Sequence, residues 1–454
     1  MDEVVAQLVS LRSRVMASEL SEGTAASVGR VVLDSLSCAL GASQEELPRR
    51  LMGLPLGTSV GPCTIVASGD RVAAEEATFV NSVLVRYLDY NDTYASLGGL
   101  GHPSDYISSV LAVAEEIDAP GDTVVRGIVG VYEAFCRMTD ALPLGFGNLD
   151  HVVYGAIASA FGAGLLWGLS DEALAQAISL AVVSNVALLA TRFGELSDWK
   201  GCAAANAARN GVFAARLGRQ GVTGPEAPFV GRGGLCSLLG QEVDTAALED
   251  EALVAVQQTH LKLWPCGVLA QSAIEAARDV QRRVNCDDVQ SICVRTFAQA
   301  VKMMASDNEK WSPTTPHTAD HSLPYVVACA LAEGGVGVDS FGPVYLSDGR
   351  IRRLMKVLHV EEDPKLTLAW PGTMGAEVEV KLNSGDQVVA RVDKFRGFAG
   401  EHLAPRDQEF KVRSLAEGVI GADRVSSFVD TCYRLEGLGA GPLLARCIRA
   451  EGTL

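Results

Sequence analysis

The segment from Asp89 to Asp105 is the most polar interruption in a chain whose apolar residues otherwise repeat with helical spacing. It holds three carboxylates, several hydroxyl groups, an imidazole and a set of glycines. It lies between residues 73–88 and 107–117, and both flanking stretches have the periodicity of buried helices. A loop this polar between two buried elements faces a cavity or solvent. Any fold of this chain therefore has to place residues 89–105 at the edge of a helical core.

Apolar spacing predicts helices over most of the first 268 residues. Two are expected between residues 6 and 40, with a break near residues 21–23, and Ser170 is expected to cap a later one. A glycine-rich stretch at 145–151 leads into a helix of mostly small residues, which neighbouring helices can approach closely. A short extended piece is expected at 62–69. The remaining predicted helices are 106–118, 123–142, 155–169, 173–182 and 202–217.

The pattern changes after residue 268. A helix is predicted at 268–280, a strand at 291–300, a helix at 324–332 and a hairpin formed by 377–382 and 387–392. With a prior of about 150 residues per domain, the length favours more than one unit. We predict a mainly α protein with two domains. Residues 1–268, completed by 396–454, form a large all-helical domain on which the helical tail 411–454 packs back, and 269–395 form a smaller α+β lid domain.

Charge and cysteine content narrow the function classes. The formal net charge is −17 and the pI is near 4.9, so we expect no nucleic-acid partner, because phosphate binding needs clustered Lys and Arg. Eleven cysteines are scattered without a C-x-x-C pair, which does not fit zinc or iron–sulfur ligation. We therefore expect buried thiols, no metal and a reducing, cytoplasmic location.

Hydrophobic residues make up 48% of the chain, which supports large buried cores. No uninterrupted apolar run approaches the roughly 20 residues of a membrane span, so we expect no membrane association. The acidic first residues do not follow the order of a signal peptide, and we expect no export.

Six polar residues lie at or near the ends of predicted elements, where a side chain can point into a shared cleft: Asp89, Thr93, His102, His151, Lys200 and Lys262. Taken singly, each has an ordinary explanation, because boundary histidines are often structural, lysines are usually solvated and an Asp can form a turn. Taken together, two lysines can bind carboxylates, and two imidazoles with an acid can move protons near neutral pH. The set suits elimination next to a carboxylate, which needs no metal where fixed donors hold the developing charge.

Other catalytic motifs do not fit. The chain has no G-x-x-x-x-G-K-[ST] loop and no H-E-x-x-H. The glycines at 231–234 follow a proline-containing loop instead of a strand, which does not fit a phosphate-binding turn.

Several motifs, in a fixed order, carry a family resemblance. They are Leu88-Asp89-Tyr90-Asn91-Asp92-Thr93, Gly101-His102-Pro103-Ser104-Asp105, Asp150-His151-Val152-Val153, the run from Gly194 to Ala203, Thr223-Gly224-Pro225-Glu226, Lys262-Leu263-Trp264-Pro265 and Ala319-Asp320-His321-Ser322-Leu323-Pro324-Tyr325. From about residue 20 to 400, the chain resembles the MmgE/PrpD family.

The resemblance implies a large helical domain with a smaller α+β lid, a homodimer, and chemistry without metal or organic cofactor. It implies a pocket that contains the six polar residues, with His102 or His151 as base or acid and Lys200 and Lys262 on the carboxylates of the substrate. Asp89 and Thr93 would orient the substrate hydroxyl or a histidine. Further substrate contacts are expected from Asn91, Asp92, Ser104 and Arg192.

Within the family, Asn91-Asp92-Thr93 and the long spacing to His102 look closest to the 2-methylcitrate dehydratase branch. We therefore predict a metal-independent hydro-lyase that eliminates water from a β-hydroxy carboxylic acid of the 2-methylcitrate type. Two alternatives stay open. Apolar residues at 97–100 and an altered motif at 397–405 leave room for dehydration, decarboxylation or epimerisation of another carboxylate, for example a polyketide-derived one. The other alternative is a binding protein that keeps the fold without catalysis.

Overall fold

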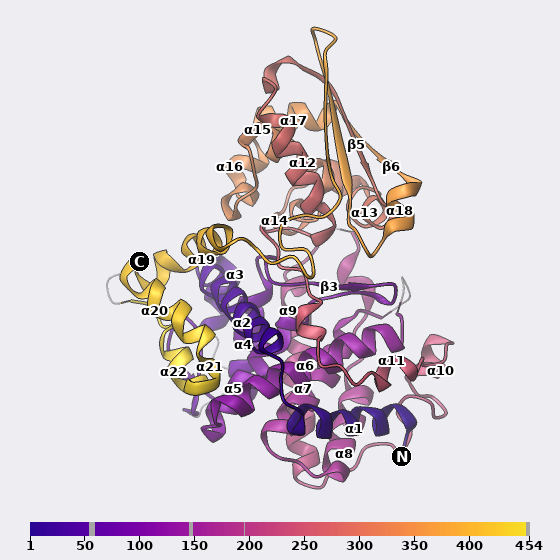
Figure 1. Cartoon of the computed structure of the whole chain (residues 1–454), viewed down its shortest axis with the longest axis vertical. Helices are drawn as coiled ribbons and strands as arrows, with labels where there is room; N and C mark the ends of the chain where they lie inside the picture. The colour runs from indigo at the N-terminus through magenta and orange to yellow at the C-terminus, as the bar shows by residue number, and fades with distance from the viewer. Residues whose placement is uncertain (54–59, 145–148, 195, 451–454) are drawn as a thin grey trace.

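The computed structural model describes residues 1–53, 60–144, 149–194 and 196–450. Residues 145–148 of the glycine-rich stretch, Glu195 of the motif at 194–203 and the last four residues of the tail lie outside the described residues. The protein is mainly α, with a large helical body and a smaller α+β domain (Figure 1).

The helical body is built around α7 (Val152–Leu166), in which every residue is buried. Small residues in α7 let other helices approach closely, as the sequence predicts. The ring of Tyr106 lies directly over Gly155, and Val131 of α6 lies over Gly162. The helices of the body are α1 (Glu3–Ala17), α2 (Glu22–Ala42), α3 (Glu46–Met52), α4 (Ala74–Arg86), α5 (Ile107–Ile117), α6 (Gly121–Ala141), α7, α8 (Asp171–Ser184), α9 (Trp199–Arg219), α10 (Leu235–Leu239) and α11 (Ala246–Glu249).

Local signals place most helix ends. The predicted break near residue 21 is confirmed, because Ser21 caps α2 by accepting a hydrogen bond from Thr24 N. Ser170 caps α8 in the same way through Ala173 N. The short extended piece predicted at 62–69 contains β1 (Cys63–Thr64), which pairs with β2 (Arg71–Val72).

The segment 89–105 is more ordered than a plain loop. It contains a small hairpin, β3 (Tyr94–Ser96) with β4 (Gly99–Gly101), followed by a short 3-10 helix at Pro103–Tyr106. The strands are too short for a period-two pattern, so sequence periodicity could not reveal them.

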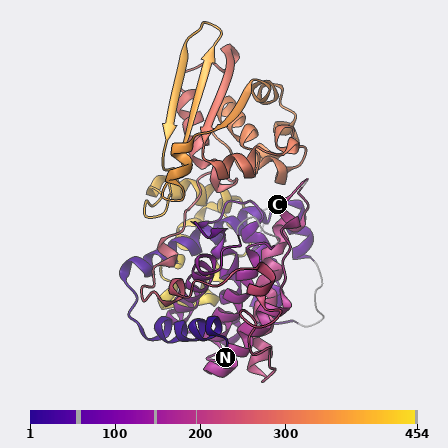
Figure 2. The same ribbon diagram turned by 90° about the vertical axis from the view of Figure 1, so that its right-hand side faces the viewer.

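The α+β domain has a four-stranded sheet in the order β6-β5-β7-β8. The predicted hairpin is confirmed as β7 (Ala376–Leu382) and β8 (Gln387–Val392), and β5 (Val289–Thr296) lies antiparallel to β7. Helix α12 (Gln271–Gln281) packs on β7 and β8, and α15 (Leu323–Glu333) packs on α12 (Figure 2).

Two sequence predictions in this domain were wrong. The strand expected at 291–300 ends at Thr296, because α13 (Ala298–Met304) begins there. The edge strand β6 (Leu358–Glu362), parallel to β5, was not predicted, because its alternation of apolar and polar residues covers only four positions.

The C-terminal helices return to the body, as predicted. Helices α19 (Pro405–Ile420) and α20 (Ala422–Tyr433) pack on α2. The 21-residue α2 is long and apolar enough to cross a membrane, but 78% of its most apolar window is buried inside the protein, as expected for a core helix.

Two backbone hydrogen bonds lie at the boundary between the body and the α+β domain. Leu261 N donates to Gly397 O within the body, and Gly267 N donates to Asp320 O of the α+β domain. The chain thus leaves the body near residue 267 and returns near Gly397, and the segment holding Asp320 is fixed against the point of departure.

Gly155→Ala tests the close packing of α7. A Cβ at this position would lie about 2 Å from the Tyr106 ring, which is fully buried and cannot move aside. We expect a loss of roughly 1–3 kcal/mol in the free energy of unfolding, measured by urea denaturation. The matched control is Gly418→Ala in α19, where a Cβ meets nothing within 4 Å. There, alanine is expected to be neutral or stabilising, and equal effects of the two changes would contradict this account.

Candidate active site

A cavity of about 250 Å³ lies where the two domains meet. The body contributes polar side chains to its wall: Arg86, Asp89, Thr93, His102, His151, Arg192 and Lys200. The α+β domain contributes Gln299, Lys310, His321 and several apolar residues. The cavity therefore exists only when both domains are folded and in contact.

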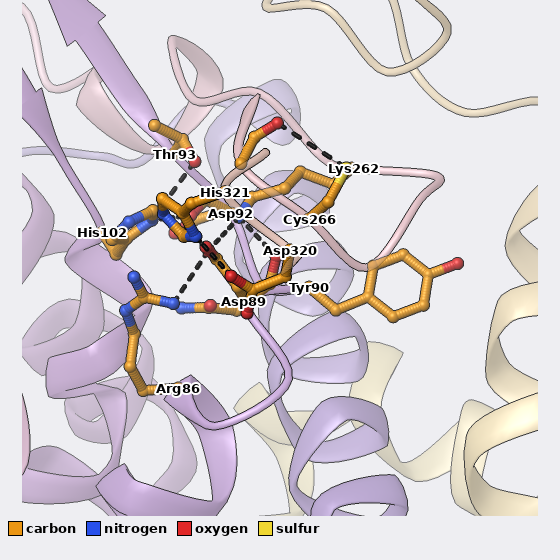
Figure 3. A network of polar contacts seen from close by, with 12 residues as sticks. Arg86, Asp89, Tyr90, Asp92, Thr93, His102, Lys262, Cys266, Asp320 and His321 are labelled. Atoms are coloured by element: carbon orange, nitrogen blue, oxygen red, sulfur yellow. Dashed lines mark hydrogen bonds and ion pairs between the residues drawn. The ribbon is translucent and has the colours of Figure 1, made fainter. Parts of the chain in front are cut away.

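Asp89, just after the end of α4, is the centre of the polar network beside the cavity (Figure 3). Its carboxylate is buried and accepts hydrogen bonds at Oδ1 from Arg86 at 2.8 Å and from Lys262 Nζ at 2.6 Å. Lys262 Nζ also donates to the backbone oxygen of Asp89 at 2.6 Å. Asp89 has a left-handed backbone conformation, with φ of 48°. Asp tolerates this conformation better than most residues, and Lys262 holds the backbone oxygen and Oδ1 of Asp89 in place.

The α+β domain completes the network. His321 Nε2 lies 3.1 Å from Asp89 Oδ2, and His321 Nδ1 lies 2.5 Å from Asp320 Oδ1. Lys200 Nζ lies 2.9 Å from both oxygens of Asp320 and 3.8 Å from Asp89 Oδ2. The network thus links α4 and α9 of the body to residues 320 and 321 of the other domain.

The cations keep Asp89 ionised. Burial alone would raise its pKa, but the positive charges of Arg86, Lys262 and Lys200 hold the pKa well below its ordinary value. Burial and the Lys200 ammonium lower the pKa of His321 to about 4, against the opposing effect of the two carboxylates. The imidazole of His321 is therefore neutral near pH 7.

His102 is fixed in one tautomer. Its Nδ1 lies 2.7 Å from the backbone oxygen of Asp92, which can only accept, so Nδ1 carries the proton. Thr93 Oγ1 lies 3.2 Å from the same nitrogen. Burial, with Arg86 and Lys262 nearby, holds the pKa of His102 well below its ordinary value. The ring is therefore neutral near pH 7, and Nε2 has a free lone pair.

His151 forms a second acid–base group. Its Nδ1 lies 2.7 Å from Asp150 Oδ1, while Asp150 Oδ2 accepts from Arg192 Nε at 2.7 Å. Burial lowers the pKa of His151, and Asp150 partly offsets this effect. Among the described residues, its Nε2 has no hydrogen-bond partner. The two histidine rings lie 5.8 Å apart, close enough to act on neighbouring atoms of one substrate.

Of the six residues expected in the pocket, the structure places five on the cavity wall. Lys262 does not line the cavity, and its side chain is fully buried behind Asp89. The expectation that Lys262 binds a substrate carboxylate is therefore wrong in its geometry. Its charge acts on the site through Asp89, because a buried carboxylate is the nearest and strongest acceptor for an ammonium group.

Three of the four expected substrate contacts also lie off the cavity wall. Asp92 accepts from Ser104 N at 3.2 Å and from Tyr132 at 2.8 Å, and Asn91 donates to Ser104 Oγ and Asp105 at 2.8 Å each. These buried groups bond to one another, and burial raises the pKa of Asp92 to about 6. They hold the His102 loop in shape, whereas Arg192, the fourth expected contact, does line the cavity.

Sequence reasoning missed three charged or titratable groups on the wall: Arg86, Lys310 and His321. Arg86 was read as part of a buried helix without a role, although its position three residues before Asp89 is a usable signal for an ion pair. His321 lies in a quoted motif and could have been chosen. Lys310 gave no signal, because it lies in a short 3-10 helix with surface-like composition.

Among the described residues, two clusters have the spacing of a divalent metal site: Asp89 with Asp320 and His321, and Cys293 with His359 and Glu361. In the first cluster, Arg86, Lys200 and Lys262 already neutralise the carboxylates. These cations supply the positive charge that a metal would bring. The second cluster lies on the exposed face of the sheet, away from the cavity.

Comparison with known families matches most of the chain. Residues 6–248 match the MmgE/PrpD N-terminal domain, and residues 264–435 match the MmgE/PrpD C-terminal domain. The boundary between the two matches falls at the junction that holds Lys262 and the start of the α+β domain.

Individual relatives carry two different activities. The chain is 25% identical to a 2-methylcitrate dehydratase of Cupriavidus necator, over 94% of this chain and 96% of the relative. It is 24% identical to the 2-methylcitrate dehydratase of Escherichia coli strain K12, over 89% and 92%. It is also 25% identical to the human cis-aconitate decarboxylase, over 90% of this chain and 87% of that protein.

Lys262→Met tests the indirect role of this lysine. The change removes a buried cation from Asp89, and breaking one partner of a buried pair costs roughly 3–5 kcal/mol. We expect a clear fall in the melting temperature, measured by calorimetry at pH 7. Lys356→Met, at an exposed position in α17 (Gly349–Lys356), is the matched control and should stay within about 0.5 kcal/mol of the parent. A Lys262 variant as stable as the control would show that the pair contributes nothing.

Proposed function

The chain belongs to the MmgE/PrpD family, and we propose that it is a hydro-lyase that eliminates water from a β-hydroxy carboxylate. The observation that carries the proposal is the pair of neutral imidazoles, 5.8 Å apart, that face one cavity beside a buried ammonium group. Each imidazole has Nδ1 held by an oxygen acceptor and Nε2 free of such a contact. The relatives named above are lyases, which supports the same general class of reaction.

His151 is proposed as the base. When it takes a proton from the carbon next to the substrate carboxylate, it becomes an imidazolium, and Asp150 at 2.7 Å stabilises that charge. His102 has only a backbone oxygen and a hydroxyl as neighbours of its Nδ1, so it is less able to hold a positive charge. His102 Nε2 instead accepts a hydrogen bond from the substrate hydroxyl and sets its direction.

Lys200 is proposed as the acid. Burial lowers its pKa from the ordinary value, which makes the ammonium a better proton donor. As the carbon–oxygen bond breaks, Lys200 gives a proton to the departing hydroxyl, and the pair left on carbon forms the double bond. The products are water and an unsaturated carboxylate. Arg86 lies on the same wall and stabilises the negative charge that develops in the transition state.

Decarboxylation is the second candidate, because a cis-aconitate decarboxylase is as similar to the chain as the dehydratases are. The same base and cations can stabilise a carbanion formed by loss of carbon dioxide. Elimination releases the hydroxyl group of the substrate as water, whereas decarboxylation releases carbon dioxide. The proton from Lys200 is therefore needed for the proposed elimination.

The homodimer implied by the resemblance and the cytoplasmic location expected from the cysteines stay proposals. Four apolar side chains, Val186, Leu188, Phe193 and Trp199, are between 49% and 60% exposed on the segment that brings Arg192 to the cavity. A second copy of the chain is a natural partner for such a segment, and light scattering measures the mass directly.

The reaction is tested by incubating purified protein with 2-methylcitrate and with cis-aconitate, both in EDTA. A rise in ultraviolet absorbance with a mass loss of one water from 2-methylcitrate would confirm the elimination. Loss of carbon dioxide from cis-aconitate without dehydration would favour the second candidate. Conversion of neither acid by folded protein would exclude both of these substrates, and activity lost in EDTA and restored by a divalent metal would contradict the metal-free mechanism.

The pH profile tests the base. Burial lowers the pKa of His151 and of Lys200, so kcat/KM should follow a bell with its acid limb below pH 6.5 and its alkaline limb below pH 10.5. Asp150 raises the pKa of His151. Asp150→Asn should therefore move the acid limb to lower pH as well as slow the reaction, while His151→Gln should cut kcat by roughly 10²–10⁴. An acid limb that stays in place in the Asp150 variant would argue for His102 as the base.

A further inference from the structure

Three of the cationic side chains on the cavity wall are already paired with carboxylates, which reduces the net positive charge of the wall. Arg86 is paired with Asp89 at 2.8 Å, Lys200 with Asp320 at 2.9 Å, and Arg192 with Asp150 at 2.7 Å. A cation that already has a buried carboxylate partner offers a ligand far less net charge than a free one. These three pairs together cannot neutralise the several carboxylates of a tricarboxylic acid.

Lys310 is the exception. Its side chain is 3% exposed and lines the cavity. Across residues 1–53, 60–144, 149–194 and 196–450, its ammonium has no hydrogen bond or ion pair, although Asp320, Asp307 and Glu309 are close enough to affect its pKa. Burying an unpaired charge is costly, so this ammonium is placed to receive a negative group from a ligand.

Apolar side chains from both domains form the rest of the wall. The hairpin β3–β4 contributes Leu97 and Leu100, the body contributes Leu149, and the α+β domain contributes Met303, Met304 and Trp370. A tricarboxylate would leave these surfaces against charged or hydrated groups, whereas an alkyl chain would bury them. The wall thus favours a ligand that is polar at one end only.

We propose that the substrate is a β-hydroxy acid with one carboxylate, bound by Lys310, and an apolar chain that lies against Leu100, Met303 and Trp370. The inference rests on the proposed dehydration and names the substrate class for it. Asp89, His321 and the two imidazoles then surround the hydroxyl-bearing carbon between the carboxylate and the chain. Met303 and Leu100 set the specificity for chain length.

Binding constants test the substrate class without relying on turnover. Calorimetric titration of the full chain with 3-hydroxybutanoate, 3-hydroxyhexanoate, 3-hydroxyoctanoate and 2-methylcitrate gives Kd for each. Every two added methylenes should tighten binding by up to roughly 15-fold, the value for full burial. 3-Hydroxyoctanoate should bind more tightly than 2-methylcitrate. A flat series, or tighter binding of 2-methylcitrate, would overturn the inference.

Two variants assign the ends of the ligand. Lys310→Met, an apolar side chain of similar length in a buried position, should fold normally and weaken binding of 3-hydroxyoctanoate at least tenfold, and Lys310→Arg should restore part of it. Met303→Gln should flatten the dependence on chain length. Lys365→Met, at an exposed position in α18 (Pro364–Ala369), is the control for loss of charge and should bind as the parent does. Unchanged affinity in the Lys310→Met variant would refute its role.

Turnover of the same acids separates this inference from the proposed function. If affinity rises with chain length but no acid loses water, the dehydratase proposal fails and the substrate class stands. If 2-methylcitrate is dehydrated efficiently while the 3-hydroxy acids neither bind nor react, the substrate class fails and the dehydratase proposal stands.

Discussion

The buried carboxylate of Asp89 is the interaction on which the rest of the structure depends. Arg86 comes from α4, Lys262 from the segment that leaves the body, Lys200 from α9 and His321 from the α+β domain, and all four lie around one side chain. An isolated buried charge costs several kcal/mol, so none of these groups can be buried alone. The elements must therefore dock together, and the cavity forms as a consequence.

The same argument extends to the C-terminal helices. Lys411 of α19 donates to Asp34 of α2 at 2.6 Å, to the backbone oxygen of Tyr90 at 2.7 Å and to that of Lys262 at 2.9 Å. Helix α19 thus holds from behind the two segments that carry Asp89 and Lys262. Up to residue 450 the tail contributes no side chain to the cavity wall, yet it fixes the position of the groups that do.

The sequence predicts the helices better than the site, for a physical reason. A helix such as α7 repeats its buried face every few residues, and that pattern is visible in one chain. The site depends on which groups pair across long separations. Lys262 and Lys200 look alike in sequence, but one lies behind Asp89 and the other on the wall. Lys310 gave no pattern at all and β6 only a very short one, because their surroundings come from residues far away in the chain.

Burial gives the site its chemistry and also limits what can enter it. Removing water lowers the pKa of His102 and His151, which leaves both imidazoles neutral and able to accept protons near pH 7. It also favours the pairing of buried cations with carboxylates, as for Arg86, Arg192 and Lys200, which removes most of the free positive charge from the wall. A highly charged substrate would have to break those pairs or stay hydrated. An imidazole base that burial keeps neutral therefore fits best with a substrate that is mostly apolar. Within the described part of the chain, the ammonium of Lys310 is unpaired, which agrees with one carboxylate.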